Sequence, residues 1–320
     1  MTYREVTMRS LTLGSFLVSA TLLAGCGSDT ILGPVGRVGT PSFEKGESVD
    51  ATFTYTTFDV PGAVSTIASG INARGDIVGT YIDAGGRRHG FAQREGIFTT
   101  IDYPGAAGTE ARGIGPSGDI VGFYWRPGEL GAGAGGVSAH GFLLDNQGEF
   151  ARVDYLPHAN VVAQRILPNG TILGCYHDAD LMDSMHGIVV GRYGRQALDQ
   201  PASMNMGGTP NGRRITGFFT DTDGQVKGYI KEDGSFTSFM VPQSKATQAW
   251  DINPAGEITG FYRDAALVLH GFVRLGDHYS TLNVPGASAT RALGINATGK
   301  VVGNYVVGGQ THAFLATPEE

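Results

Sequence analysis

The sequence predicts an all-β fold, a six-bladed β-propeller of four-stranded blades whose ring is closed by the N-terminal strand. The main observation is a repeated signature: Val-Pro-Gly-Ala at 60–63, Gly-Ile-Asn at 70–72, Gly-Asp-Ile-Val-Gly at 75–79 and His-Gly-Phe at 89–91. Its proline returns as Pro104, Pro157, Pro201, Pro242 and Pro285. A repeat of roughly 40–45 residues that is dense in short strands and turns is typical of propeller blades.

Each repeat contains four strand candidates in a fixed order, as the first repeat illustrates. Residues 66–72 and 76–82 are separated by a turn that contains Gly75. A glycine-rich turn then leads into a third strand at 89–94, and a short turn leads into a fourth at 97–103. The first turn requires a positive φ, which is easily reached only by glycine. Its glycine returns as Gly118, Gly170, Gly212, Gly256 and Gly299.

The phase of the repeat predicts how the ring closes. The domain opens at 53–60 with a match to the fourth strand, and it ends at 312–316 with a match to the third. Six blades are complete only if the N-terminal strand pairs beside the C-terminal one. This arrangement hides two sheet edges that would otherwise be free to pair with other chains.

The N-terminus has the pattern of an export signal, because a basic start precedes a short apolar stretch at 11–24. This stretch is shorter than the ~20 residues of a membrane span. The sequence Leu-Ala-Gly-Cys at 23–26 resembles the lipobox of bacterial lipoproteins, which implies lipidation of Cys26. The alternative is an ordinary signal peptide with a chance cysteine. Because Gly27 rather than aspartate follows, the resemblance implies the outer membrane or the cell surface.

This interpretation divides the chain into a signal peptide with its lipobox at 1–26, a flexible Gly/Ser/Pro-rich tether at 27–50 and the propeller at 51–320. A lipid bilayer, reached through Cys26, is therefore an expected partner. The formal net charge is −7 and no Lys/Arg run follows the tether, so nucleic acid is not an expected partner. Cys175 is the only other cysteine, so no internal disulfide is expected.

The repeated His-Gly-Phe or His-Ala-Phe unit, preceded by Gly-Ile-Asn and Gly-Asp-Ile-Val-Gly, resembles the HAF repeat family of probable extracellular bacterial proteins. The resemblance covers residues 53–316. The chain departs from the pattern where Lys227 replaces the histidine and where 201–208 lacks the usual apolar strand. The family is defined by its repeat and its presumed export, so the resemblance supplies no catalytic residues.

The repeated histidines do not predict a metal site. They lie one per blade, so a propeller spreads them around a ring that is far too wide for a shared zinc ion. We expect ring nitrogens that satisfy backbone groups at the start of the third strands, and we expect no metal or other cofactor. The histidines in question are His89, His140, His186, His270 and His312.

Candidate site residues are those that break the repeat at shared positions near the mouth of the central channel. One set occupies the first strands: Ile67, Glu110, Val162, Met204, Gln248 and Arg291. A second set lies two residues further on: Ser69, Arg112, Gln164, Met206, Trp250 and Leu293. From these we predict ligand contact by Glu110, Arg112, Gln164, Gln248, Trp250 and Arg291, between loops 125–139 and 177–185. Trp250 would stack on a sugar ring, and the arginines would pair with a carboxylate.

Two functions fit this pattern. The first is an exported binding or interaction module of the cell envelope, with a glycan or an envelope protein as its partner. The second is a polysaccharide lyase or glycoside hydrolase with its site on the same rim. A lyase would need a proton acceptor such as His177 or Tyr176, with Arg112 or Arg291 neutralising a uronate carboxylate. A convergent His/Tyr/Arg cluster in one pocket would favour the enzyme.

Overall fold

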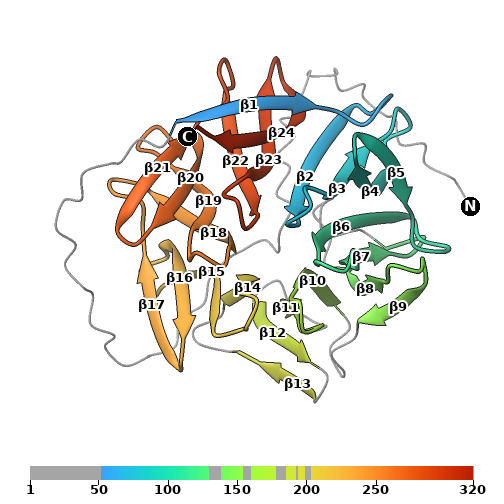
Figure 1. Ribbon diagram of the computed structural model, residues 1–320, viewed down its shortest axis with the longest axis horizontal. Coiled ribbons are helices and arrows are strands. Elements are labelled where there is room, and N and C mark those ends of the chain that lie inside the picture. Colours follow the sequence, from blue (N-terminus) through green and yellow to red (C-terminus); the bar gives the residue numbers. More distant parts are fainter. Residues whose placement is uncertain are drawn as a thin grey trace, which may run out of the picture.

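The computed structural model describes residues 52–129, 138–153, 160–177, 185–191, 194–198 and 203–319. These residues form six four-stranded antiparallel sheets around a central axis, which confirms the predicted propeller (Figure 1). This part of the chain contains no helix, and hence none that could cross a membrane. The predicted signal peptide, Cys26 and the tether lie outside the described residues.

Blades 1 to 5 are each formed by four consecutive strands, with the first strand nearest the axis (Figure 1). Blade 1 comprises β2 (Ser65–Ile71), β3 (Ile77–Ile82), β4 (Arg88–Arg94) and β5 (Ile97–Ile101). Blade 2 comprises β6 (Gly108–Ile114), β7 (Ile120–Trp125), β8 (His140–Leu144) and β9 (Phe150–Val153). Blade 3 comprises β10 (Asn160–Ile166), β11 (Ile172–His177), β12 (Met185–Gly191) and β13 (Gly194–Ala197).

Blade 4 comprises β14 (Ser203–Gly208), β15 (Arg214–Thr220), β16 (Val226–Glu232) and β17 (Ser235–Phe239). Blade 5 comprises β18 (Ala246–Ile252), β19 (Ile258–Arg263), β20 (Leu269–Leu275) and β21 (His278–Leu282). The segment 201–208 does contain an innermost strand, β14, although its sequence lacks the usual apolar pattern. Met204 and Met206 are both fully buried there and supply the apolar contacts.

Blade 6 is completed by the N-terminal strand, as the phase of the repeat predicts. It comprises β22 (Ala289–Ile295), β23 (Val301–Val307), β24 (Gln310–Pro318) and the outermost strand β1 (Phe53–Phe58). The register of β1 on β24 runs from Phe53 opposite Pro318 to Phe58 opposite Ala313. The first residues of β1 therefore lie beside the C-terminus (Figure 1).

The propeller has two rims. We call the end where innermost strands begin the upper rim; Ser65 and Ala289 lie there, together with the second-to-third-strand loops. The lower rim is the end where innermost strands turn into second strands, as at Asn72. Because β1 runs from Phe53 beside Pro318 toward the upper rim, the chain enters the propeller at the lower rim.

The third-strand histidines have a structural role, but their partners differ from those expected. His89 Nδ1 lies 2.9 Å from Asp102 Oδ1 and its Nε2 lies 3.2 Å from Asp83 Oδ2, while the ring stacks on Tyr81 at 4.9 Å. At His89, side-chain carboxylates rather than backbone groups therefore satisfy the ring. In blade 4, Lys227 Nζ lies 2.7 Å from Asp221 Oδ2 and occupies the same structural role.

Candidate functional site

Each innermost strand contains a β-bulge. The bulged residues are the second set of repeat-breaking positions from the sequence analysis, the set that begins with Ser69 and ends with Leu293. All six are at most 4% exposed, so they line a closed throat rather than an open channel. Blades 1 to 3 contribute the polar sector of this throat: Ser69, Arg112 and Gln164. Blades 4 to 6 contribute the apolar sector: Met206, Trp250 and Leu293.

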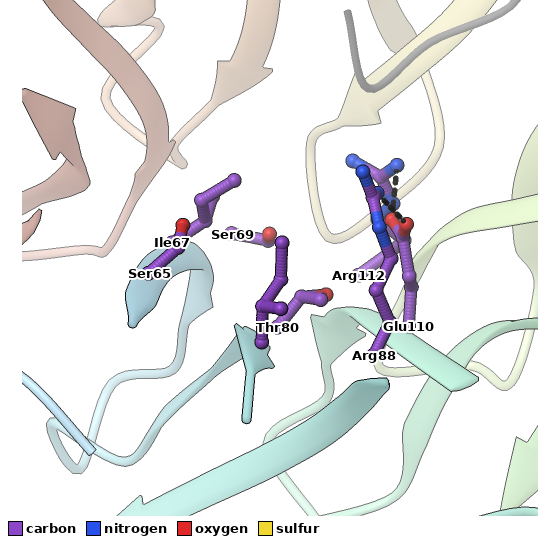
Figure 2. Close-up of a pocket in the computed structure, with 8 residues that line it drawn as sticks. Ser65, Ile67, Ser69, Thr80, Arg88, Glu110 and Arg112 are labelled. Carbon is purple, nitrogen blue, oxygen red and sulfur yellow. Dashed lines mark hydrogen bonds and ion pairs between the residues drawn. The ribbon is translucent and has the colours of Figure 1, made fainter. Parts of the chain in front are cut away.

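A charged cluster of Arg88, Glu110 and Arg112 lies in the polar sector. Arg88 Nη1 donates to Glu110 Oε1 at 2.7 Å, and Arg112 Nη2 donates to Glu110 Oε2 at 2.7 Å (Figure 2). The three side chains are 12%, 1% and 2% exposed, in that order. Both carboxylate oxygens of Glu110 therefore accept bonds from arginines inside the protein, and its contact with a ligand stays a prediction.

A pocket of about 10 Å³ lies beside this cluster. The cluster lies on one side, and the side chains of Ser65, Ser69 and Thr80 lie on the other (Figure 2). The three hydroxyl oxygens and Arg112 Nε are buried and have no hydrogen-bond partner. Gln164 is fully buried, and neither atom of its amide has a hydrogen-bond partner. Buried polar atoms without partners are uncommon in proteins, so their concentration here makes this pocket a candidate binding position.

Trp250 lies in the apolar sector and does not present a face to solvent. Its ring packs 6.2 Å from Phe218 and 5.8 Å from Phe261, and the side chain is 4% exposed. Its Nε1 donates to Gln248 Oε1 at 3.3 Å. The expected stacking of Trp250 on a sugar is therefore incompatible with this geometry, since residues of neighbouring blades already cover the ring.

Arg291 is the candidate whose charge is least compensated. Its guanidinium lies 5.7 Å from the Phe261 ring, and it is mostly buried. Burial lowers the pKa of Arg291, and the positive charge of Arg263 lowers it further. Among the described residues, no ion pair links either arginine to a carboxylate. Gln248, at the equivalent position of blade 5, is half-buried on the same rim.

Among the catalytic candidates whose side chains are described, Tyr176 lies apart from Arg112 and Arg291. Tyr176 is 5% exposed, its ring stacks on His186 at 4.7 Å, and it belongs to the core cluster between blades 2 and 3. Its chain neighbour Cys175 faces the throat, so Tyr176 points to the opposite face of the sheet. His177 ends β11, but its side chain is outside the described part of the structure. Most of the two predicted loops, at 130–137 and 178–184, is outside it as well.

The sequence reasoning missed two charged residues on the axis. At the position after the bulge, four blades have glycine: Gly70, Gly113, Gly207 and Gly294. Blades 3 and 5 have Arg165 and Asp251 instead. Arg165 donates hydrogen bonds to backbone carbonyls of Ser69, Arg112 and Leu293, and to that of its neighbour Gln164. Comparison of the six repeats at this position was the signal that could have found the pair.

A wider pocket of about 190 Å³ lies at the lower rim, below the throat. Arg165 and Asp251 line it together with Asn72, Asn253 and Asn296 from the turns after the innermost strands. These asparagines already bond neighbouring blades; for example, Asn253 Nδ2 donates to Asn296 O at 3.0 Å. The described residues contain no group of three or more His, Cys, Asp or Glu that could hold a metal ion.

No family model matches the chain, and no curated protein matches it. Similar solved structures include TolB from Acinetobacter baumannii, with a TM-score of 0.53 and 10% identity over 82% of this chain and 66% of that one. The SapL1 lectin in complex with alpha methyl fucoside gives a TM-score of 0.50 and 13% identity over 77% and 90%. A gluconolactonase from Xanthomonas campestris gives a TM-score of 0.48 and 11% identity over 86% of this chain and 98% of that one. At these identities the likeness shows the propeller fold alone.

Proposed function

We propose that the chain is an exported, lipid-anchored binding module that holds a carboxylate-bearing glycan of the cell envelope at its upper rim. The observation that carries this proposal is the mostly buried guanidinium of Arg291, which has Arg263 beside it and no carboxylate partner among the described residues. A desolvated cation without a counter-ion is costly, and an anionic ligand would remove that cost. A carboxylate fits the planar guanidinium through two parallel hydrogen bonds.

The same rim has apolar surface beside these arginines. In the second-to-third-strand loop of blade 5, Leu267 is 59% exposed. Its φ of 66° lies in the left-handed region, where the equivalent turns of blades 1 and 4 have Gly86 and Gly224. Val307 in the neighbouring blade is 41% exposed. An exposed leucine in the left-handed region is unusual, and residues held in such conformations often belong to functional sites. Apolar side chains of this kind can contact the C–H face of a sugar.

The position of the first strand supports an outward-facing upper rim. The chain enters β1 at the lower rim, so a tether that runs from Cys26 would attach the propeller to a membrane from that side. The upper rim would then face away from the membrane and toward envelope polymers. The SapL1 lectin, which has the same fold, supports the proposal only in that a propeller of similar extent holds a sugar.

The experiment is a binding screen of the full chain, purified in detergent, against uronate-containing and neutral envelope polysaccharides. We expect binding of the uronate-containing polymers, followed by calorimetry of Arg291→Met and Arg263→Met. Loss of one charge-assisted hydrogen-bonded contact costs about 1.5–3 kcal/mol, or roughly 10- to 100-fold in affinity. Arg213→Met is the matched control, because Arg213 is exposed on the lower rim and paired with Asp233.

Each alternative gives a different result. If both rim variants bind as tightly as the wild type while remaining folded, the ligand site is elsewhere. Mass analysis of the polysaccharide after incubation tests the enzyme alternative, since cleavage products would show catalysis. Capture of a single envelope protein, with no binding of glycans, would make that protein the partner. Membrane fractionation and intact mass of wild type and Cys26→Ala test the anchor, which predicts a lipid-sized increment only in the wild type.

A further inference from the structure

We propose that the polar sector of the throat holds a buried monovalent anion of the halide class, in the pocket between the charged cluster and the hydroxyl groups of Ser65, Ser69 and Thr80. This site is separate from the glycan contact proposed above, because Arg291 and Arg263 are not among the residues that line it.

Charge is the first argument. The residues that line the pocket include two guanidinium groups, from Arg88 and Arg112, and one carboxylate, from Glu110. Counted over the residues that line the pocket, positive charges exceed negative charges by one. Glu110 is 1% exposed and Arg112 is 2% exposed, so solvent screens this excess charge weakly. A single bound monovalent anion would neutralise the cluster, whereas a neutral water molecule would not.

The second argument concerns donors. Ser65, Ser69 and Thr80 are 8%, 2% and 5% exposed, and none of their hydroxyl oxygens has a partner. Arg112 Nε is a further buried donor without a partner. A hydroxyl can rotate to donate to an anion, and a guanidinium nitrogen can only donate. Water accepts about two hydrogen bonds and must also find acceptors, so a group that only accepts matches this set of donors better.

Size selects the class of anion. The pocket has a volume of about 10 Å³, and a cavity needs roughly that volume to hold one water molecule. A carboxylate, sulfate or phosphate ion is much larger than this space, whereas chloride and bromide are single atoms that are only moderately larger than a water molecule. Ile67 and Ile82 also line the pocket, and their apolar side chains favour a weakly hydrated ion.

The test compares the full chain in sodium gluconate, sodium chloride and sodium bromide at equal ionic strength. We expect a saturable rise of the melting temperature with halide concentration and none with gluconate. Crystals soaked in bromide are expected to show an anomalous peak in the pocket. In Thr80→Val, which removes one donor at similar volume, the half-saturating halide concentration is expected to rise at least tenfold.

Thr259→Val is the matched control, because Thr259 is a fully buried threonine whose hydroxyl donates to Phe272 O at 2.9 Å. It should lower the melting temperature without changing the halide dependence.

Arg88→Met, at the partly exposed end of the cluster, provides a second variant if Thr80→Val does not fold. Equal melting temperatures in the three salts, with no anomalous peak, would overturn the proposal. A non-saturable salt effect that is the same in Thr80→Val would also overturn it. Arg291→Met should leave the halide response intact, which separates this site from the glycan site.

Discussion

Arg165 Nε lies 3.1 Å from Asp251 Oδ2, and this contact joins blade 3 to blade 5 on the axis of the propeller. The Asp251 carboxylate also accepts hydrogen bonds from the backbone N–H groups of Ile252 and Ile295. Burial raises the pKa of Asp251, while Arg165 and these two N–H groups act in the opposite direction. Together with its bonds to blades 1, 2 and 6, Arg165 connects five of the six blades.

Arg165→Gly is expected to destabilise the propeller, although glycine occupies this position in four other blades. The substitution leaves Asp251 buried without its cation and leaves several carbonyls without their donor, a situation that costs about 3–5 kcal/mol. Urea unfolding measures the effect. Together with Asp251→Gly and the double variant, this substitution forms a double-mutant cycle that measures the coupling between the two residues. The double variant should lose less unfolding free energy than the sum of the losses in the two single variants. Equal urea midpoints for Arg165→Gly and the wild type would show that the pair does not hold the blades together.

The second prediction concerns β1, the strand that closes the ring. Deletion of residues 52–60 removes β1 and exposes the backbone edge of β24. An unpaired edge strand can pair with other chains, so we expect a lower melting temperature and concentration-dependent aggregation. Light scattering after size-exclusion chromatography measures the second effect. Deletion of residues 30–38 in the predicted tether is the control of equal length. A monomeric protein with an unchanged melting temperature would contradict closure by this strand.

The repeat made the fold predictable, because the same strand and turn signals recur along the chain, once in each of the six blades. What the repeat could not show is which side of each blade the irregular residues face. Trp250 breaks the pattern, but its burial depends on Phe218 of another blade, and no local signal in the sequence encodes that contact. Nor did the sequence indicate that Glu110 pairs with Arg88, which lies on the third strand of the neighbouring blade.

A third prediction concerns the glycines of the second strands. A Cβ on Gly260 would overlap the carbonyl oxygen of Gln248 and would lie 2.9 Å from the ring of Phe272. Gly260→Ala should therefore lower the free energy of unfolding by about 1–3 kcal/mol or more, because the surrounding strands cannot move apart cheaply. Gly191→Ala is the control, since the nearest atom to its added Cβ would be 3.7 Å away. Equal unfolding midpoints for the two variants would show that the close approach carries no constraint.

The last prediction concerns acid sensitivity. Hydrogen bonds from the Arg87 N–H and from His89 lower the pKa of Asp83, and a bond from His270 lowers that of Asp264. Burial raises the pKa of Asp221, but Lys227 and two backbone N–H groups outweigh it and lower the pKa overall. A carboxyl with a lowered pKa in the folded state holds its proton less tightly than in the unfolded state. Its contribution to stability is therefore complete at a pH above the pKa of the unfolded state, which is about 3.9. This contribution is lost as the pH falls through the pKa of the folded state.

The variant with Asp83→Asn, Asp221→Asn and Asp264→Asn tests this link directly. Asparagine retains an oxygen that accepts the turn N–H groups but cannot ionise, so the charge is removed while the turn is kept. We expect a lower melting temperature at pH 7 and a shallower fall below about pH 4, so that the two curves converge in acid. Asp223→Asn, an exposed change in the same turn as Asp221, should follow the wild type. Parallel curves for the triple variant and the wild type would mean that these carboxylates do not cause the acid sensitivity.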